Sequence, residues 1–234
     1  MIRLVCFADD QMKKSQALCI ESSLKYGIDN CWSHNPDSIG QLFKEYNDQI
    51  WNLPRGVGHW LWKPYIIYQS ILHSKDDDIL VYADSGIEFI APIAPIIDSM
   101  GDIFLFTNGH RNAEWSKMDI LETIIPGKWD MEQRQVQATV IFFRVNQRTK
   151  DFVKEWLLYC QFPGLIDDSP SKLKNVETFA ENRHDQSILT ALCIKHNIDF
   201  MHWWPTTYSA HLPRSEKDNY PVLFNHHRRR NSEY

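Results

Sequence analysis

One carboxylate follows the segment of this sequence that is most typical of a buried strand. Residues 79–82 form a short apolar run bounded by turn signals on both sides, and Asp84 comes directly after it. In open α/β sheets ligands bind beyond the carboxyl ends of strands, and the small residues Ser85 and Gly86 leave room for a ligand to approach the backbone. A hard divalent cation commonly bridges such a carboxylate to substrate phosphates. An acid at an ordinary strand-to-turn junction explains the segment equally well.

A glycine-rich segment provides a second candidate site. Gly56 and Gly58 allow a tight backbone approach, and the helix expected just after them offers free N–H groups to an anion. Arg55 and Lys63 add positive charge that suits a diphosphate. The glycine spacing matches neither the Walker motif nor the dinucleotide fingerprint. A structural turn before an aromatic-rich core helix explains the segment almost as well.

Two further groups of polar residues lie in the second half of the chain. Asp185 and Gln186 stand where a helix is expected to begin, and capping is the ordinary role of an Asp at that position. A functional role requires that this pair project into a cleft. Residues 225–230 read N-H-H-R-R-R; neutral imidazoles ligate divalent metals and arginines clamp phosphates, although a solvated basic tail is the ordinary interpretation.

The elements that must position these residues alternate between strands and helices. The patterns predict strands at residues 2–7, 30–33, 79–82, 103–107, 138–144 and 200–204, and helices at residues 11–26, 38–50, 60–72, 149–159 and 185–196. Residues 107–119 are expected to form a loop, residues 163–175 a mobile loop, and residues 208–234 an irregular polar tail. This order predicts an α/β protein of one domain, residues 1–234, with a mixed, mostly parallel sheet flanked by helices.

Composition excludes several classes of protein. A net charge of −5 over 234 residues argues against a nucleic-acid-binding protein, which is usually basic. The five cysteines form no C-x-x-C pair and indicate reduced thiols in a reducing compartment. The first residues contain no secretory signal, and the most apolar later stretch is too short to be a transmembrane segment. We therefore expect a cytoplasmic protein, free or peripheral at a membrane.

Taken together in this order, the four segments resemble nucleotide-sugar glycosyltransferases of the GT-A fold. In that family an acidic D-x-D motif at a strand end and a C-terminal His hold Mn²⁺ or Mg²⁺ on the donor diphosphate. The sequence V-Y-A-D-S-G at residues 81–86 looks like a degenerate form with one acid, Asp84, and the resemblance makes His226 or His227 the second metal ligand. The segment G-H-W-L-W-K-P at residues 58–64, followed by this motif, is similar to small bacterial and large-DNA-virus glycosyltransferases, including those of chlorella viruses that build capsid glycans. The resemblance covers roughly residues 4–230.

The resemblance also implies roles for particular residues. Asp185 and Gln186 are similar to the acid–Gln pair that opens a helix beside the anomeric carbon in retaining enzymes of the glycogenin type, which makes them the catalytic candidates. Residues 137–143 resemble the strand that lines the donor-sugar pocket in those enzymes. Residues 224–234 would be a basic tail that closes over the donor site. The candidates for donor binding are Arg55, Gly58, Trp62, Lys63, Ser85, Gln137 and Arg228.

The function expected from this resemblance is metal-assisted transfer of a hexose or deoxyhexose. The donor would be a nucleoside diphosphate sugar, with UDP favoured, and the acceptor a glycan hydroxyl; retention is favoured only through the Asp185–Gln186 similarity. A non-catalytic glycan-binding module is the first alternative, since clustered Trp residues would suffice for it. A phosphatase of the haloacid dehalogenase type is a weaker one, because it requires a second acid two residues after the first, where this chain has Gly86.

Overall fold

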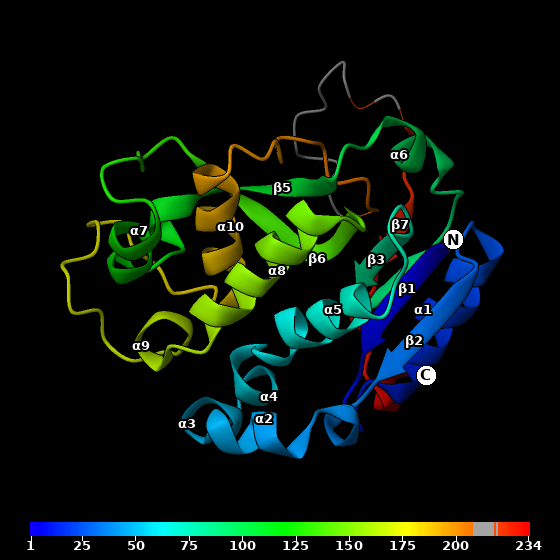
Figure 1. The fold of residues 1–234 in the computed structure, drawn as a ribbon, viewed down its shortest axis with the longest axis horizontal. Coiled ribbons are helices and arrows are strands. Elements are labelled where there is room, and N and C mark those ends of the chain that lie inside the picture. The colour runs from blue at the N-terminus through cyan, green and yellow to red at the C-terminus, as the bar shows by residue number, and fades with distance from the viewer. Residues whose placement is uncertain (208–217, 219) are drawn as a thin grey trace.

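A five-stranded sheet runs through the computed structural model, which describes residues 1–207, 218 and 220–234 (Figure 1). Its strand order is β2-β1-β3-β6-β5. The strands are β1 (Ile2–Phe7), β2 (Asn30–His34), β3 (Ile79–Ala83), β5 (Ile103–Arg111) and β6 (Arg134–Arg144). β1 pairs in parallel with β2 and β3, whereas β6 pairs antiparallel with both β3 and β5. Only β6 therefore runs against the other strands of this sheet, and the predicted mixed, mostly parallel sheet is confirmed.

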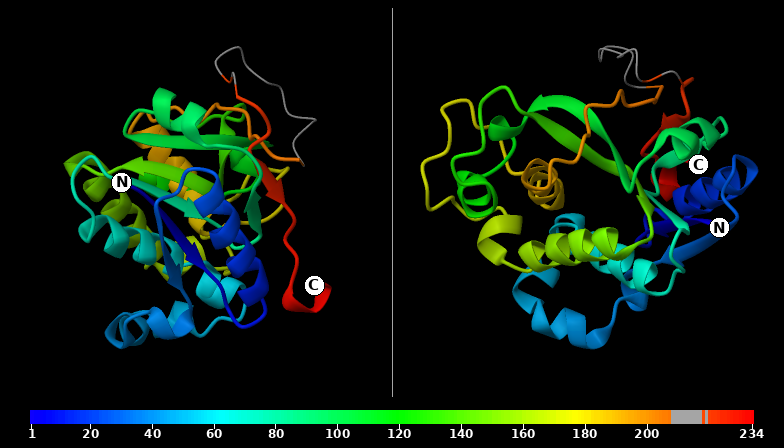
Figure 2. Two further views of the ribbon diagram at one scale, coloured as in Figure 1. Left: turned by 90° about the vertical axis from the view of Figure 1, so that its right-hand side faces the viewer. Right: turned by 45° about the horizontal axis from the view of Figure 1, so that its top comes forward.

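Both faces of the sheet are buried along β1, β3 and β6, which explains why these strands contain continuous apolar runs. Val5 and Phe7 of β1 point into a core shared with α5, α7, α8 and α10, while Leu4 and Cys6 point into a core shared with α1 and α6. Figures 1 and 2 show these helices on opposite sides of the sheet. Because alternate residues serve opposite cores, each strand is fixed in register from both sides.

Helices pack on both faces of the sheet. They are α1 (Lys13–Lys25), α2 (Gln41–Tyr46), α3 (Asp48–Trp51), α4 (Gly56–His59), α5 (Trp62–Leu72), α6 (Ala94–Ser99), α7 (Met118–Ile124), α8 (Gln147–Cys160), α9 (Pro163–Ile166) and α10 (Asp185–Lys195), with 3₁₀ turns η1 (Pro36–Ser38), η2 (Asn112–Glu114) and η3 (Asn231–Glu233). Within the described part of the chain, none of the helices has the length and apolar character that a bilayer span requires.

Several local predictions were wrong. The helix predicted at residues 38–50 is broken into η1, α2 and α3, because Asn35 caps the 3₁₀ turn with its side chain and Asn47 separates the two helices. Residues 200–204 form no strand: the backbone N–H of Trp203 donates to the Asp218 carboxylate (2.7 Å) rather than to a sheet neighbour. The expected loop at 107–119 instead continues β5 as far as Arg111.

The C-terminal segment is more regular than an irregular tail. Residues 208–217 and 219 of the predicted tail lie outside the described residues. In the described remainder, β7 (Phe224–His226) pairs antiparallel with β4 (Ile87–Phe89). The chain then crosses the start of α1, where the Asn231 backbone N–H donates to the carbonyl of Gln11 (2.7 Å).

Candidate active site

A cavity of about 650 Å³ opens at the carboxyl edge of the parallel strands. Its wall contains Asp9 after β1, Asp84 after β3, Gln137 of β6, Gln186 at the start of α10, and Arg228 after β7. Segments that are far apart in the sequence therefore contribute polar groups to one pocket. This is the position at which α/β sheets bind their ligands.

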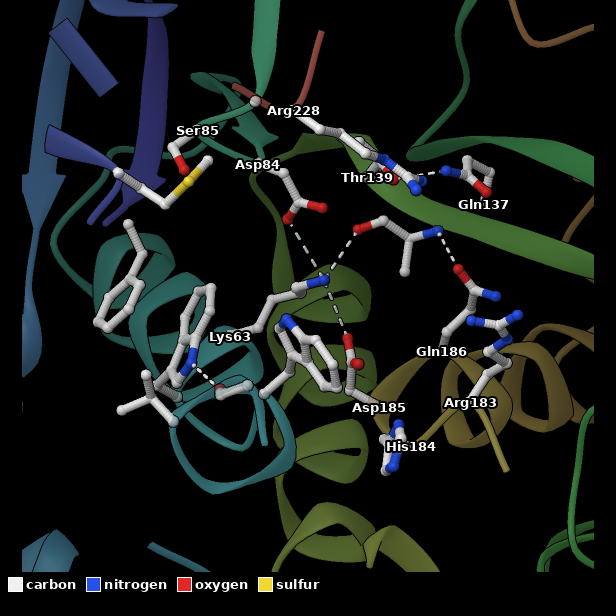
Figure 3. Close-up of a pocket in the computed structure, with 18 of the residues that line it drawn as sticks. Lys63, Asp84, Ser85, Gln137, Thr139, Arg183, His184, Asp185, Gln186 and Arg228 are labelled. Atoms are coloured by element: carbon white, nitrogen blue, oxygen red, sulfur yellow. Dashed lines mark hydrogen bonds and ion pairs between the residues drawn. The ribbon is translucent and has the colours of Figure 1, made fainter. Parts of the chain in front are cut away.

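A buried lysine stands at the base of this pocket. The Lys63 ammonium lies 3.1 Å from Oδ2 of Asp185 and 3.4 Å from Oδ1 of Asp84, and it donates to the Ala138 carbonyl at 3.2 Å. Figure 3 shows it between the two carboxylates. Burial alone would lower the pKa of Lys63, but the two carboxylates outweigh that effect and raise it. Lys63 is therefore a fixed positive charge that joins α5 to the end of β3, to β6 and to the start of α10.

Asp185 is the first residue of α10, and its carboxylate makes no helix cap. The cap position is His184, whose φ is +55°, and it forms no side-chain capping bond. Only 5% of the Asp185 side chain is exposed, and the indole N–H of Trp156 donates to its carbonyl (3.0 Å). Burial raises the pKa of Asp185 to about 6, against the opposing effect of Lys63. A buried acid titrating near neutrality is typical of functional sites.

One carboxylate oxygen of Asp84 is fixed by a side chain of β3, the strand that precedes it. The Tyr82 hydroxyl donates to Oδ1 of Asp84 at 2.5 Å, on the same oxygen that faces Lys63. Burial raises the pKa of Tyr82 well above its usual value, so the phenol keeps the proton that it donates. About a third of the Asp84 side chain is exposed, which leaves Oδ2 as the oxygen available to a ligand.

Hydrogen bonds of the Gln186 side chain link α10 to β6. Oε1 of Gln186 accepts from the backbone N–H of Ala138 (3.2 Å), and its amide donates to Gln135 (2.8 Å). The Gln137 amide donates to the Thr139 hydroxyl at 2.5 Å, and both side chains border the pocket. Gln186 therefore fixes the start of α10 against the strand, while Gln137 faces the cavity.

The glycine-rich segment lies partly in the pocket wall, to which Gly56 contributes. Gly58 has φ +78°, and a Cβ there would lie 2.9 Å from the Cα of Trp51, so this glycine is required by packing and does not border the pocket. Arg55 does border it, but its guanidinium binds Asp168 (3.3 Å) and Glu181 (3.1 Å). Trp62 stacks on Phe7 with ring centroids 3.8 Å apart and borders the pocket.

The last residue of β7 and residues after it also border the cavity. His226 and Arg228 border the pocket together with Ser85, and Nε of Arg228 donates to Nε2 of His226 at 2.8 Å. Burial lowers the pKa of His226 to about 4, with Arg228 adding to the effect, so the imidazole is neutral. His227 is not part of the pocket wall; its Nδ1 accepts from the Arg229 backbone N–H (3.0 Å). The two neighbouring histidines thus face different surroundings.

Sequence reasoning missed several residues of the pocket wall. Asp9 follows β1 as Asp84 follows β3, so the strand-end rule that selected Asp84 applied to it as well. Asn108 and His110 were overlooked because their segment was expected to be a loop, whereas they lie in β5, which still pairs with β6 at Arg111. Arg183 and His184 precede the predicted helix, and no local pattern signals their role.

Comparison with known proteins shows the fold. No protein-family model and no curated protein matches this sequence. The chain is similar in structure to the apo form of the bifunctional glycosyltransferase WbbM, with a TM-score of 0.51 and 13% identity over 88% of this chain and 39% of WbbM. It is also similar to apo mouse xyloside xylosyltransferase 1, with a TM-score of 0.53 and 8% identity over 97% of each chain. The chain therefore has a GT-A-like fold, and it spans well under half the length of WbbM.

Proposed function

We propose that this protein transfers a hexose or deoxyhexose from a nucleoside diphosphate sugar, UDP-linked, to a hydroxyl of a glycan. The observation that carries the proposal is Lys63, buried between Asp84 and Asp185 at the base of the strand-end pocket. Burying charges such as those of Lys63 and Asp185 is costly unless they are paired, and such clusters concentrate at sites of chemistry. The fold, shared with solved glycosyltransferases, agrees with this reaction.

The charges of the pocket suit the departure of a nucleoside diphosphate. Breaking the glycosidic bond leaves negative charge on the diphosphate and positive charge on the sugar. Arg228 and Arg230 border the pocket and supply guanidinium groups for the diphosphate oxygens. Asp185, on the opposite side of Lys63, supplies the negative charge for the sugar (Figure 3). The two ends of the breaking bond thus meet opposite charges.

Asp185 has the central part in this mechanism. In the retaining reaction that we favour, its carboxylate stabilises the oxocarbenium-like sugar; in an inverting reaction it would take the acceptor proton. Lys63 holds the carboxylate in place and keeps most of it ionised near neutral pH despite its burial. Gln186 fixes the start of the same helix against β6, and so orients Asp185 toward the pocket.

The residues at Asp84 also fit a divalent cation. Tyr82 and Lys63 contact Oδ1 of Asp84, which leaves Oδ2 for a metal, and neutral His226 has a lone pair on Nε2 that now accepts from Arg228. One carboxylate and one imidazole suit Mn²⁺ better than Mg²⁺, which prefers oxygen ligands alone. When bound, the cation would neutralise charge on the diphosphate.

Thermal unfolding with nucleotides tests this proposal. UDP and UDP-sugars should raise the melting temperature, because a ligand at a hundredfold excess over its Kd adds about 2.7 kcal/mol of stability. The increase should be larger in Mn²⁺ than in EDTA, because the cation at Asp84 would help to bind the diphosphate. Asp84→Asn is the matched variant: it keeps the side-chain volume, and it should abolish the difference between Mn²⁺ and EDTA. If no nucleoside diphosphate shifts the melting temperature in either condition, the donor assignment is wrong. Stabilisation by oligosaccharides alone would instead favour the glycan-binding module.

A further inference from the structure

We propose that His59, Asp168 and His184 form a second metal site, for a divalent transition-metal ion of the Zn²⁺ class. One ligand atom from each of these residues lies within 4.8 Å of the others. The site is distinct from Asp84 and His226, and the proposal does not rest on the proposed function.

Three separate segments bring these ligands together. His59 ends α4, Asp168 follows α9, and His184 immediately precedes α10. Nε2 of His184 lies 2.9 Å from Oδ1 of Asp168, and Nδ1 of His59 lies 3.8 Å from Oδ2 of the same carboxylate. The two imidazole rings stack with centroids 4.6 Å apart, so both present a nitrogen to one acid.

The burial of the two histidines favours ligation over an ordinary hydrogen-bonded cluster. Their side chains are 4% and 2% exposed, and burial favours the neutral imidazole that metals bind. Nδ1 of His59 is buried, and it has no hydrogen-bond partner within the part of the chain that the structure describes. A His184–Asp168 hydrogen bond alone leaves this nitrogen unsatisfied, whereas a metal ion would engage both imidazoles and the carboxylate.

The backbone holds both histidines in an unusual conformation. His59 has φ +51° and His184 has φ +55°, values in the left-handed region that non-glycine residues rarely adopt. Such conformations persist only where the surroundings impose them, and they cluster at functional sites. Here they direct two rings from different segments toward Asp168.

The ligand set identifies the class of ion. Two imidazoles and one carboxylate suit Zn²⁺ and its neighbours, whereas Mg²⁺ and Ca²⁺ prefer oxygen ligands. Three protein ligands leave a fourth position for water. Arg55 contacts Asp168 at 3.3 Å from outside the cluster and would orient the carboxylate as an outer-shell partner. Because His184 adjoins Asp185, the ion would brace the start of α10 beneath the candidate active site.

Metal content measured without any nucleotide tests this site. The full-length protein is stripped with a chelator, titrated with Zn²⁺ and freed of unbound ion, and the zinc bound per chain is then determined. Co²⁺ gives a second readout through its visible absorption. We expect one tightly held ion in the wild type, and affinity reduced at least about hundredfold in both His59→Gln and Asp168→Asn. Asp84→Asn is the control and should keep the ion.

The outcomes separate this site from the one at Asp84. Failure of the wild type to bind Zn²⁺, or equal binding by Asp168→Asn, would overturn the proposal. Loss of the ion in Asp84→Asn but not in Asp168→Asn would assign the metal to the other site and overturn it too. Asp168 is 47% exposed, so its variant should fold even where His59→Gln does not, and it then decides the question alone.

Discussion

A lysine shared by two acids is the main chemical feature of this protein. Lys63 is buried and lies within 3.4 Å of both Asp84 and Asp185, so the protonation of one acid affects the other through it. Removing one partner of such a group leaves an uncompensated charge, which makes each member sensitive to substitution. The predictions at this scale therefore concern single charges.

Asp185→Asn should damage turnover much more than donor binding. The amide keeps the volume of the side chain but removes the charge that faces the sugar, so kcat and kcat/KM should fall together by about a hundredfold to a thousandfold. The Kd for UDP, measured by calorimetry, should change little. A variant about 1 kcal/mol less stable but fully active would instead indicate a merely structural role for Asp185.

The pH dependence of activity should follow the same carboxylate. Burial raises the pKa of Asp185 to about 6, so the fraction of charged Asp185 falls as pH drops through that value. We expect kcat/KM to increase with pH up to a plateau, with a midpoint near 6, because this parameter reports ionisations of the free enzyme. The residual activity of Asp185→Asn should lack that step. A wild-type profile that is flat from pH 5 to 8 would contradict this role.

The two adjacent histidines should respond differently to substitution. His226 borders the pocket, whereas His227 does not. His226→Ala should weaken Mn²⁺-dependent binding of UDP about tenfold or more, and His227→Ala should leave it within about threefold. Calorimetric titration of UDP in Mn²⁺ and in EDTA measures both. Equal losses in the two variants would show that the pocket does not distinguish them.

At the scale of elements, the junction of α3 and α4 depends on one glycine. Gly58 combines φ +78° with a close approach to the backbone of Trp51, so Gly58→Ala should lower the free energy of unfolding by about 1–3 kcal/mol. Gly101→Ala is the control, because a Cβ at Gly101 meets nothing within 4 Å. Urea unfolding compares the two, and equal stabilities would refute the packing role.

Local sequence patterns predicted the helices and strands better than they predicted which residues of different elements come into contact. The strand-end rule identified Asp84 because a continuous apolar run bounded by turns is visible in the sequence. Lys63 can contact both Asp84 and Asp185 because β6 runs antiparallel between β3 and β5 and because α10 packs against β6. Both arrangements depend on contacts between residues that are far apart in the sequence. Asp168 lies in a segment without periodicity, so nothing local placed it beside His59.

The apolar pattern also gave a wrong strand prediction where a side chain, and not a neighbouring strand, accepts a backbone hydrogen bond. Residues 200–204 are apolar enough for a strand, but Asp218 accepts the backbone N–H of Trp203, so the segment joins no sheet. A hydrogen bond between residues 15 positions apart cannot be predicted from a short window of sequence.

At the scale of the whole molecule, the pocket draws on nearly the full chain. Its wall contains residues from Phe7 to Arg230, contributed by β1, β6, α10 and the segment after β7. The chain end is held near the start of α1, where the Lys14 backbone N–H donates to the Asn231 side chain (2.8 Å). We therefore expect the site to exist only in the folded chain as a whole.

The release of nucleoside diphosphate from nucleotide-sugars tests the central claim most directly. Glycosyltransferases also hydrolyse their donors slowly, so the assay needs no knowledge of the acceptor. The protein and its Asp185→Asn variant are each incubated with Mn²⁺ and a panel of UDP-, GDP- and dTDP-sugars. The nucleoside diphosphate that each of them releases is then measured. We expect release from at least one UDP-sugar by the wild type, reduced about a hundredfold or more in the variant. Absence of release from every donor, or equal release by the variant, would contradict the account.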